Sequence, residues 1–334
     1  MKKLLDVENL HTSFSSLSKK IRAVRGVSFD LFPGETLGIV GESGCGKSVL
    51  AKSITRLLPS NIASIDTGHV FYKGEDILQK SERKLRKIRG REIGMIFQDP
   101  MTSLNPTMKI GNQIIEGYAF HNPHVSRQEV SLRALELLDR VGIPEPESRM
   151  NQYPHELSGG MRQRVMIAIA MISYPDILIA DEPTTALDVT IQAQILDLLK
   201  EIQQREQMSI ILITHDLSIV ASFCNRVLVM YAGEVVESAP VEELFHSPKH
   251  PYTRRLLNSI PRLDLPVKRH LYSIQGTPPD LGSPIKGCSF RERCPHAMKT
   301  CLEKKPITLE VEKNHQVACW LFDPRFSRIE RKGL

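Results

Sequence analysis

Glycines, a lysine and a serine stand together in one short segment that is suited to binding phosphate. The pattern G-x-x-x-x-G-K-[ST] is matched in full by Gly41, Glu42, Ser43, Gly44, Cys45, Gly46, Lys47 and Ser48. Glycines allow consecutive backbone N–H groups to turn towards an anion, and a helix that follows adds the positive end of its dipole. Lys47 would reach the β- and γ-phosphates of a nucleotide, and the Ser48 hydroxyl would hold Mg²⁺. An ordinary glycine turn is the alternative, which the strand predicted before the segment and the helix predicted after it disfavour.

A second candidate site is a pair of acids at the end of an apolar run. The run Ile177-Leu-Ile-Ala180 leads directly into Asp181 and Glu182. The tip of a strand is where a doubly wound sheet places its ligand. Asp181 would hold Mg²⁺ through water, and Glu182 would accept a proton from the attacking water. Two solvated acids at a strand end are common, so the pair is informative because the phosphate-binding pattern precedes it.

Four of the six cysteines fall near the end of the chain and form a candidate metal centre. Their spacing is C-x₅-C-x₆-C-x₁₇-C, and they are Cys288, Cys294, Cys301 and Cys319. Four thiolates suit either structural Zn²⁺ or an iron–sulfur cluster. Zinc usually takes closer pairs, so the spacing favours a [4Fe–4S] cluster, with Zn²⁺ and four free thiols as the alternatives.

The other two cysteines receive separate predictions. Cys45 lies in the phosphate-binding segment, where inward N–H groups favour a reactive thiolate that bound nucleotide would shield. Its alternative is a small residue chosen only for compactness. Cys224, on an apolar helical stretch, is predicted to be an inert buried thiol.

Short strands and helices alternate along the part of the chain that holds the first two sites. Apolar runs bounded by charge, as in parallel core strands, lie at residues 36–40, 93–97, 176–180 and 209–214. Helical spacing is found at residues 48–58, 110–142 and 161–172. This alternation predicts an α/β fold.

Charge and composition suggest two domains in the 334 residues. Residues 1–247 have a net charge of −3, whereas residues 248–334 hold 17 Lys and Arg against 8 Asp and Glu, a net +9, and are rich in proline. The expected boundary therefore separates a domain at 1–247 from one at 248–334. The N-terminus does not have the pattern of a signal peptide, and the longest apolar stretch, Val165 to Ile172, is too short to span a bilayer. The expected location is cytosolic, or on a membrane through partners.

A segment between the phosphate-binding motif and the pair of acids resembles the signature of ABC ATPases. Leu157-Ser-Gly-Gly-Met161 is similar to LSGGQ, with Met161 where Gln is usual. Gln98 resembles the Q-loop glutamine, and His215 resembles the switch histidine. Ala186-Leu187-Asp188 resembles the D-loop, and Phe14 the aromatic residue that stacks on adenine. The resemblance implies a P-loop NTPase of the ABC type, with a mixed β-sheet core, a helical subdomain and a small Cys-rich C-terminal extension.

The family resemblance also implies an ATP site completed by a second subunit. Ser158, Gly159 and Gly160 would bind ATP that is held by the other subunit of a head-to-tail dimer. The implied catalytic residues are Lys47, Gln98, Glu182 and His215. The implied Mg²⁺ ligands are Ser48, Gln98 and Asp181.

Longer segments resemble the ATPase subunits of bacterial dipeptide and oligopeptide importers. They are Ile96-Phe-Gln-Asp-Pro-Met-Thr-Ser-Leu-Asn-Pro106, His250-Pro-Tyr-Thr-Arg-Arg-Leu-Leu257 and the cysteine tail. The resemblance implies ATP-driven peptide import at the cytoplasmic face of the cell membrane, and it implies the [4Fe–4S] cluster. Implied partners are a sister ATPase subunit, two membrane permease subunits contacted near Asp99 to Met108, and an extracytoplasmic peptide-binding protein, with no nucleic acid. Related nickel and glutathione importers are the alternative.

Other classes of ABC protein fit the sequence less well. Ribosomal members carry two ATPase units in one chain, and DNA-repair members carry long coiled-coil insertions, neither of which is found. Exporters often fuse the ATPase to spanning helices, although some do not. A regulator without turnover is disfavoured by Glu182 and His215. The stretch from Lys80 to Arg91 has seven basic residues, for which a solvated helix face is favoured over lipid or RNA contact.

Overall fold

The chain folds into two compact units. The structure is a computed structural model that describes residues 2–15, 19–99, 103–184, 189–259 and 274–325. The loop unit comprises Leu5–Asp30, Leu37–Glu75 and Thr214–Leu334, and the helical unit comprises Met1–Leu4, Leu31–Thr36 and Asp76–Ile213. No helix of the described residues is long and apolar enough to cross a bilayer.

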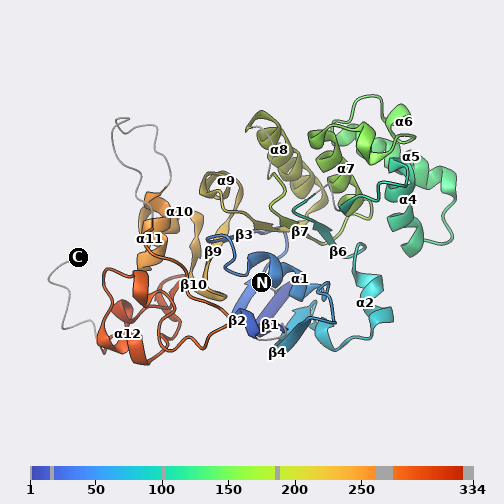
Figure 1. The fold of residues 1–334 in the computed structure, drawn as a ribbon. Helices are drawn as coiled ribbons and strands as arrows, with labels where there is room; N and C mark the ends of the chain where they lie inside the picture. The colour runs from blue at the N-terminus through green and yellow to red at the C-terminus, as the bar shows by residue number, and fades with distance from the viewer. Residues whose placement is uncertain (1, 16–18, 100–102, 185–188, 260–273, 326–334) are drawn as a thin grey trace. The chain divides into compact units, whose positions relative to one another are not determined.

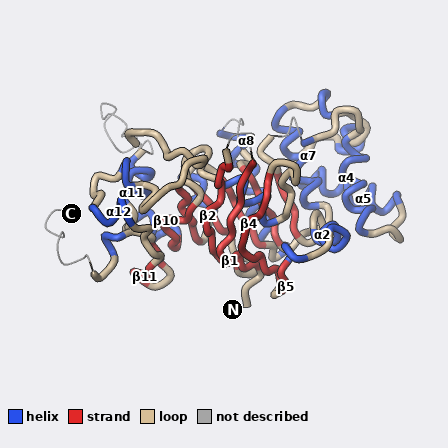
Figure 2. Tube along the Cα trace, turned by 60° about the horizontal axis from the view of Figure 1, so that its bottom comes forward, coloured by secondary structure: helices blue, strands red, loops and turns tan. Residues whose placement is uncertain are grey.

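The loop unit contains two sheets. In the first, the strand order is β2-β1-β4-β5, and β1 pairs with β4 in antiparallel register (Figure 2). These strands are β1 (Leu5–Ser15), β2 (Lys20–Leu31), β4 (Ala63–Tyr72) and β5 (Glu75–Asp76). In the second, the order is β3-β9-β10-β12-β11, where only β3 and β9 run parallel. They are β3 (Thr36–Val40), β9 (Arg226–Tyr231), β10 (Glu234–Pro240), β12 (His315–Val317) and β11 (Leu309–Glu312).

The helices of the loop unit are short and follow these strands (Figure 1). They are α1 (Lys47–Ile54), α9 (Leu217–Phe223), α10 (Val241–His246), α11 (Pro251–Asn258) and α12 (Lys299–Glu303), with single 3₁₀ turns at Arg291–Arg293 and Trp320–Phe322. The predicted strand at residues 36–40 is confirmed, and all five of its residues are buried. The helix predicted at residues 48–58 is shorter than expected and ends at Ile54.

Residues after 247 share a hydrophobic core with β9. Tyr231 of β9 packs on Tyr252 of α11 with ring centroids 4.7 Å apart, and on Phe290 at 5.1 Å. Tyr252 and Phe290 also meet at 5.4 Å, and all three side chains are buried. β12 pairs with β10 through Glu237 and Val317. A self-standing Cys-rich extension is therefore not supported, because these residues bury their apolar surface against the rest of the loop unit.

The helical unit combines three parallel strands with a group of longer helices. The strand order is β6-β7-β8, with Ile96 opposite Ala180 and Asp181 opposite Ile213. The strands are β6 (Ile93–Ile96), β7 (Ile177–Asp181) and β8 (Ser209–Ile213). Every residue of β7 and β8 is buried, as predicted for parallel core strands.

Helices α4, α5 and α7 pack together in the helical unit (Figure 1). The helices of this unit are α2 (Glu82–Ile88), α4 (Ile110–His121), α5 (Arg127–Arg140), α6 (Pro146–Arg149), α7 (Gly159–Met171) and α8 (Val189–Glu206). The single helical stretch predicted at 110–142 is thus two helices. Pro123 cannot donate to a continuing helix, and Ser126 with Glu129 forms a capping box that starts α5.

Candidate functional site

The phosphate-binding loop joins the end of β3 to the start of α1. Gly41 and Gly46 have φ values of 154° and 102°, which few residues other than glycine adopt. A Cβ atom at Gly41 would overlap the carbonyl oxygen of Met230, and one at Gly46 would overlap that of Ala23. The loop can therefore follow its path only because glycine occupies both positions.

Lys47 lies inside the loop that it is predicted to serve. Its side chain is buried, and its ammonium group donates to the carbonyl oxygens of Gly41 at 2.8 Å and Glu42 at 3.1 Å. These contacts hold the amine at the centre of the turn, where a phosphate group would replace neutral carbonyl partners with charged ones.

The prediction of a reactive thiolate at Cys45 is wrong. The side chain is 6% exposed, and burial raises the pKa of the thiol, although nearby Lys47 opposes that shift. Burial penalises the thiolate more than the ammonium group favours it. Cys224 fits its prediction, because burial raises the pKa of its thiol to about 12.

Two hydrogen bonds bring other predicted residues of the loop unit towards this loop. The buried Thr12 and Ser53 hydroxyls lie 2.8 Å apart, and they fasten the strand that carries Phe14 to α1. The N–H of Thr214 donates to the carbonyl of Ile39 at 3.2 Å, so His215 follows a residue that lies beside β3. Phe14 itself is half-buried, and His215 is exposed.

In the helical unit, Gln98 and Glu182 meet at the ends of neighbouring strands. Gln98 follows β6 and Glu182 follows β7, and the parallel register brings both to the same edge. The Gln98 amide donates to the Glu182 carboxylate at 2.9 Å. Asp181, the last residue of β7, is 1% exposed. A glutamine, an oriented glutamate and a buried aspartate at one edge can bind Mg²⁺ and position a water molecule.

The signature segment lies at the start of α7 in the same unit. The Ser158 hydroxyl accepts from the N–H of Met161 at 3.3 Å, and it caps the helix. Gln163, on the next part of the helix, donates to the carbonyl of Pro183, which directly follows Glu182. The signature helix is therefore tied to the loop that carries the predicted general base.

The predicted site residues are thus divided between the two units. Phe14, residues 41–48 and His215 belong to the loop unit, whereas Gln98, Asp181, Glu182 and residues 158–160 belong to the helical unit. The predicted D-loop residues Ala186, Leu187 and Asp188 lie outside the described residues, as do residues 100–102 of the predicted permease contact.

Two residues that the sequence did not single out hold the phosphate-binding loop. The hydroxyl oxygen of Tyr252 accepts from the N–H of Glu42 at 2.9 Å, and Arg293 forms an ion pair with the Glu42 carboxylate. Both partners follow residue 247 in the sequence. The sequence contains no local signal for these contacts, because Glu42 and Arg293 are 251 residues apart.

The four cysteines of the predicted metal centre are free thiols. Among the residues that the structure describes, no three His, Cys, Asp or Glu side chains are placed to hold a metal ion, so neither the predicted [4Fe–4S] cluster nor its Zn²⁺ alternative is supported by this geometry. Burial is the main cause that raises the pKa of Cys288 to about 11 and of Cys319 to about 12. The charges of Cys288, Cys294 and Cys301 add to the rise at Cys319, so the four sulfur atoms are close enough to influence one another.

Comparison with known proteins agrees with this geometry. Residues 24–185 match the family described as ABC transporter, and residues 236–301 match the oligopeptide/dipeptide transporter C-terminal region. The chain is 53% identical over 333 residues to the dipeptide transport ATP-binding protein DppD of Bacillus subtilis (strain 168), covering 100% of this chain and 99% of that one. It is 51% identical over 328 residues to the oligopeptide transport ATP-binding protein OppD of the same strain, covering 98% and 91%.

Solved structures show the same cassette fold. The dimeric ATP-binding cassette MJ0796 in a post-hydrolysis state with ADP and Pi matches with a TM-score of 0.65 and 29% identity, over 71% of this chain and 98% of that chain. The cbiO1 protein of Clostridium perfringens matches with a TM-score of 0.61 and 30% identity, over 74% and 92%. Because half of its residues align identically along nearly its whole length, this chain belongs to the dipeptide and oligopeptide transport ATP-binding proteins of the ABC transporter family.

Proposed function

We propose that this chain hydrolyses ATP to power the import of dipeptides or oligopeptides through a membrane ABC transporter. The observation that carries the proposal is the Gln98–Glu182 pair, which orients a carboxylate at the edge of a parallel sheet. Glu182 accepts a proton from the attacking water, and Lys47 stabilises the negative charge that develops on the phosphates. Ser48 of the loop unit, and Gln98 and Asp181 of the helical unit, are the residues that would hold Mg²⁺, and the ion would supply positive charge to offset the negative charge of the phosphates.

The glycines of the signature segment support an ATP site that is shared with a second subunit. A Cβ at Gly159 would meet no atom within 4 Å, and one at Gly160 would meet only Ile191 at an ordinary 3.5 Å. Glycine is unfavourable in a helix, and no neighbour among the described residues requires it at either position. The open space suits the close approach of nucleotide held by a second ATPase subunit, which is a sister protein or a second copy.

The proposed cargo follows from the relatives, which are named for dipeptide and oligopeptide transport. The test uses the chain purified with its membrane subunits, reconstituted into vesicles with the extracytoplasmic binding protein. ATP hydrolysis should rise when dipeptides or oligopeptides are supplied. Stimulation by nickel or glutathione instead of peptides would transfer the chain to the alternative importers. A peripheral position at the cytoplasmic face, and a division of the chain into domains at 1–247 and 248–334, belong to the same proposal.

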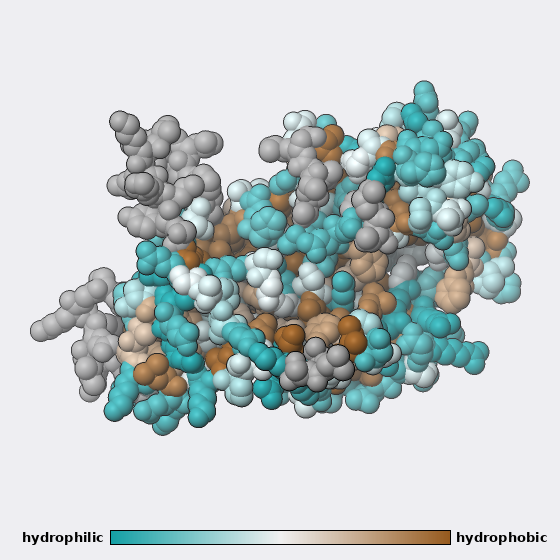
Figure 3. Space-filling model, in the orientation of Figure 1, coloured by the Kyte–Doolittle hydropathy of each residue, from teal (hydrophilic) through white to brown (hydrophobic). Residues whose placement is uncertain are grey.

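The permease contact predicted near Asp99 to Met108 stays a proposal, and we propose a pocket in the helical unit as a further docking place for a membrane subunit. The pocket has a volume of about 570 Å³, and its lining combines four cations and one acid with ring-bearing side chains: Glu82, Arg83, Arg86, Lys87, Arg91, Phe120, His121 and Pro123. Phe120 is 62% exposed, and the surface around α2 is hydrophilic (Figure 3). An occupant needs acidic groups for the cations and an apolar side chain for Phe120, as a short cytoplasmic segment of a permease can provide.

The docking proposal has a direct test. Arg86→Glu combined with Lys87→Glu should reduce co-purification of the membrane subunits at least tenfold and leave ATP binding unchanged. Unchanged co-purification would leave Asp99 to Met108 as the docking segment instead.

We further propose that Cys288, Cys294, Cys301 and Cys319 hold a [4Fe–4S] cluster. The influence of Cys288, Cys294 and Cys301 on the pKa of Cys319 supports this set, and Cys288 and Cys294 lie half-buried against the hydrophobic core. A cluster accepts thiolates that are farther apart than a single zinc ion does. Four thiolates would bind it, and it would tie this part of the chain together.

Anaerobic purification tests the cluster. The protein should be brown and absorb near 400 nm, roughly where thiolate-to-iron charge transfer falls. Cys294→Ser should lose that colour, whereas Cys224→Ser should keep it. A colourless preparation would reject the cluster, and stoichiometric zinc in it would assign the thiols to that metal.

A further inference from the structure

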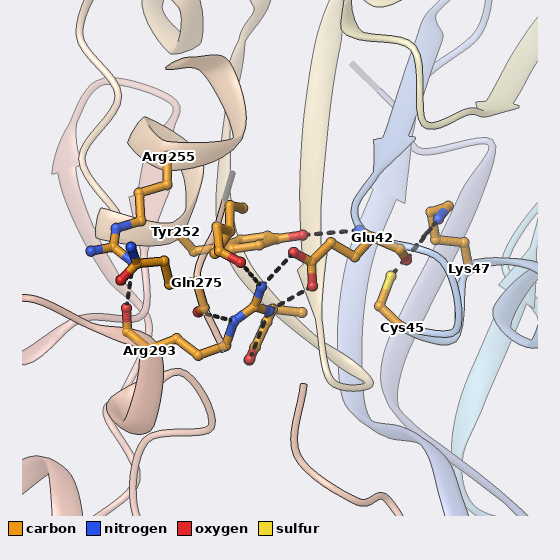
Figure 4. A network of polar contacts seen from close by, with 9 residues as sticks. Glu42, Cys45, Lys47, Tyr252, Arg255, Gln275 and Arg293 are labelled. Atoms are coloured by element: carbon orange, nitrogen blue, oxygen red, sulfur yellow. Dashed lines mark hydrogen bonds and ion pairs between the residues drawn. The ribbon is translucent and has the colours of Figure 1, made fainter. Parts of the chain in front are cut away.

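Arg293 connects the C-terminal part of the chain to the phosphate-binding loop through a two-pronged ion pair. Its two terminal nitrogen atoms donate to the two oxygen atoms of the Glu42 carboxylate, at 2.6 and 2.9 Å (Figure 4). The Arg293 side chain is 4% exposed and that of Glu42 is 23% exposed. Such a paired geometry fixes direction as well as distance, and it loses little strength to solvent at this burial.

The remaining donors of the Arg293 guanidinium group are also occupied. Its Nε donates to the carbonyl of Gln275 at 3.1 Å, and Nη2 donates to that of Ile274 at 3.0 Å. Nη1 additionally donates to the hydroxyl of Tyr231 at 3.3 Å, and the group lies 5.7 Å from the centre of that ring. The guanidinium group is therefore held by its own surroundings, and it holds Glu42 in turn.

Glu42 is fastened at its backbone as well. Its N–H donates to the Tyr252 hydroxyl at 2.9 Å, and its carbonyl accepts from Lys47 at 3.1 Å. Through these two backbone contacts, Glu42 anchors the start of the loop. Its predicted contact with nucleotide stays a prediction beside this anchoring role.

Charge gives the ion pair a second effect. A carboxylate at the edge of a phosphate-binding loop repels the polyphosphate of the nucleotide, and the repulsion is strong where solvent is partly excluded. Arg293 cancels that charge and leaves the N–H groups of the loop and Lys47 to act on the phosphates.

We propose that Arg293 is a positioning residue for ATP, through which residues after 247 set the affinity of the phosphate-binding loop. The proposal rests on the proposed function of that loop. Arg293 acts through Glu42, and Tyr252 assists it by holding the Glu42 peptide. The C-terminal region is then part of the nucleotide-binding apparatus, in addition to any metal that its cysteines hold.

The test is a double-mutant cycle on the affinity for Mg-ATP. Arg293→Met keeps the aliphatic stem and leaves the Glu42 carboxylate unpaired, so ATP binding should weaken about tenfold or more. Glu42→Gln removes the charge and should weaken binding less. The double variant should bind ATP better than Arg293→Met alone, because no stranded carboxylate remains. The dissociation constant is measured on the purified full chain with a fluorescent ATP analogue, and KM and kcat are measured on the assembled transporter.

A change in KM with little change in kcat supports a positioning role. Equal affinity of folded Arg293→Met and wild type, or equal loss in the single and double variants, overturns it. Arg325→Met is a control for the loss of a paired arginine, because Arg325 makes a two-pronged pair with Asp323 on a side chain that is 67% exposed, and the change should not alter ATP affinity. If the wild-type chain does not bind ATP, the proposed function is wrong. That outcome is distinct from the failure of the Arg293 proposal, in which wild type binds ATP but the variants do not show the expected pattern.

A milder variant guards against misfolding of Arg293→Met. Tyr252→Phe keeps the ring in its aromatic cluster and removes only the acceptor of the Glu42 N–H. ATP binding should weaken about twofold to tenfold, in line with the loss of one hydrogen bond. Unchanged binding by folded Tyr252→Phe, together with unchanged binding by Glu42→Gln, also overturns the proposal.

Discussion

Glu182 has a backbone conformation that is unusual for a residue other than glycine. Its φ is 49°, in the left-handed region, and its N–H donates to the carbonyl of Ile213 at 2.9 Å. Such conformations cost free energy and concentrate at functional positions, where they aim a side chain. Here the conformation turns the carboxylate towards the Gln98 amide at the end of β6.

Glu182→Gln should bind ATP normally and hydrolyse it about 10²–10⁴ times more slowly, as loss of a general base does. The amide has the shape of the carboxylate and keeps an oxygen that can accept from Gln98, but it cannot take up the proton of the attacking water. Steady-state ATPase and nucleotide-binding assays measure the two effects. Glu136→Gln, on the exposed face of α5, is the control and should behave as wild type. Hydrolysis close to wild type by Glu182→Gln would remove Glu182 from the role of base.

His250 makes the stability of the loop unit depend on pH. It is 1% exposed, and its Nδ1 accepts from the N–H of Tyr252 at 3.0 Å, which caps α11. Burial lowers the pKa of His250 to about 4, and Glu237 opposes the shift only in part. The His250 imidazole is therefore protonated at about pH 6.5 in the unfolded chain, but only at about pH 4 in the folded chain. The contribution of His250 to the free energy of unfolding is fully present above about pH 6.5. It is lost as the pH falls from there to about 4, a decrease of about 3 kcal/mol.

His250→Asn should flatten this dependence, because the Asn oxygen can cap the helix and does not titrate. Urea unfolding of wild type and variant is compared at pH 7.5 and pH 5. Exposed His246 supplies the control, since His246→Asn should retain the wild-type slope. A slope that is unchanged in His250→Asn would assign the pH dependence to other groups.

The two glycines at the start of α7 are unfavourable for the helix itself but suit the proposed contact with nucleotide on a second subunit. The first two residues of α7 are these glycines, and the described residues around them leave space for a side chain. A helix that serves only its own chain gains from alanine at such positions. The cap by Ser158 and the bond from Gln163 to Pro183 hold this end of the helix without help from the glycines.

Gly159→Ala should therefore have opposite effects on stability and function. The melting temperature of the isolated chain should stay the same or rise, with a gain of at most about 1 kcal/mol. ATP hydrolysis by the assembled transporter should fall at least tenfold, because the methyl group occupies the space that nucleotide on the partner subunit needs. Gly117→Ala is the matched control, since Gly117 lies in α4 and also has no neighbour within 4 Å of a Cβ. Full activity of Gly159→Ala would contradict the shared site.

Along the full chain, features that depend on neighbouring residues can be predicted from the sequence, whereas partners distant in the sequence cannot. The loop from Gly41 to Ser48, and the strand that ends at Asp181, depend on neighbouring residues and were found from the sequence. The contact of Gln98 with Glu182 depends on the register of two parallel strands, and the family resemblance implies only that both residues are catalytic, not that they meet. The ion pair between Glu42 and Arg293 leaves no periodic trace in the sequence. Burial of Cys45 by the folded loop overturned a prediction that considered only the local dipoles.

The separation of Glu42 from its partners limits how this molecule can be recombined. A chain cut after residue 247 would keep the entire match to the ABC transporter family, and it would still lose both Tyr252 and Arg293. Chimeras that exchange the C-terminal region between related subunits would lose the same contacts, unless the residue at position 42 is exchanged together with that region. Residues 1–247 and 248–334 must therefore be kept or exchanged together, although the sequence composition divides them into two domains.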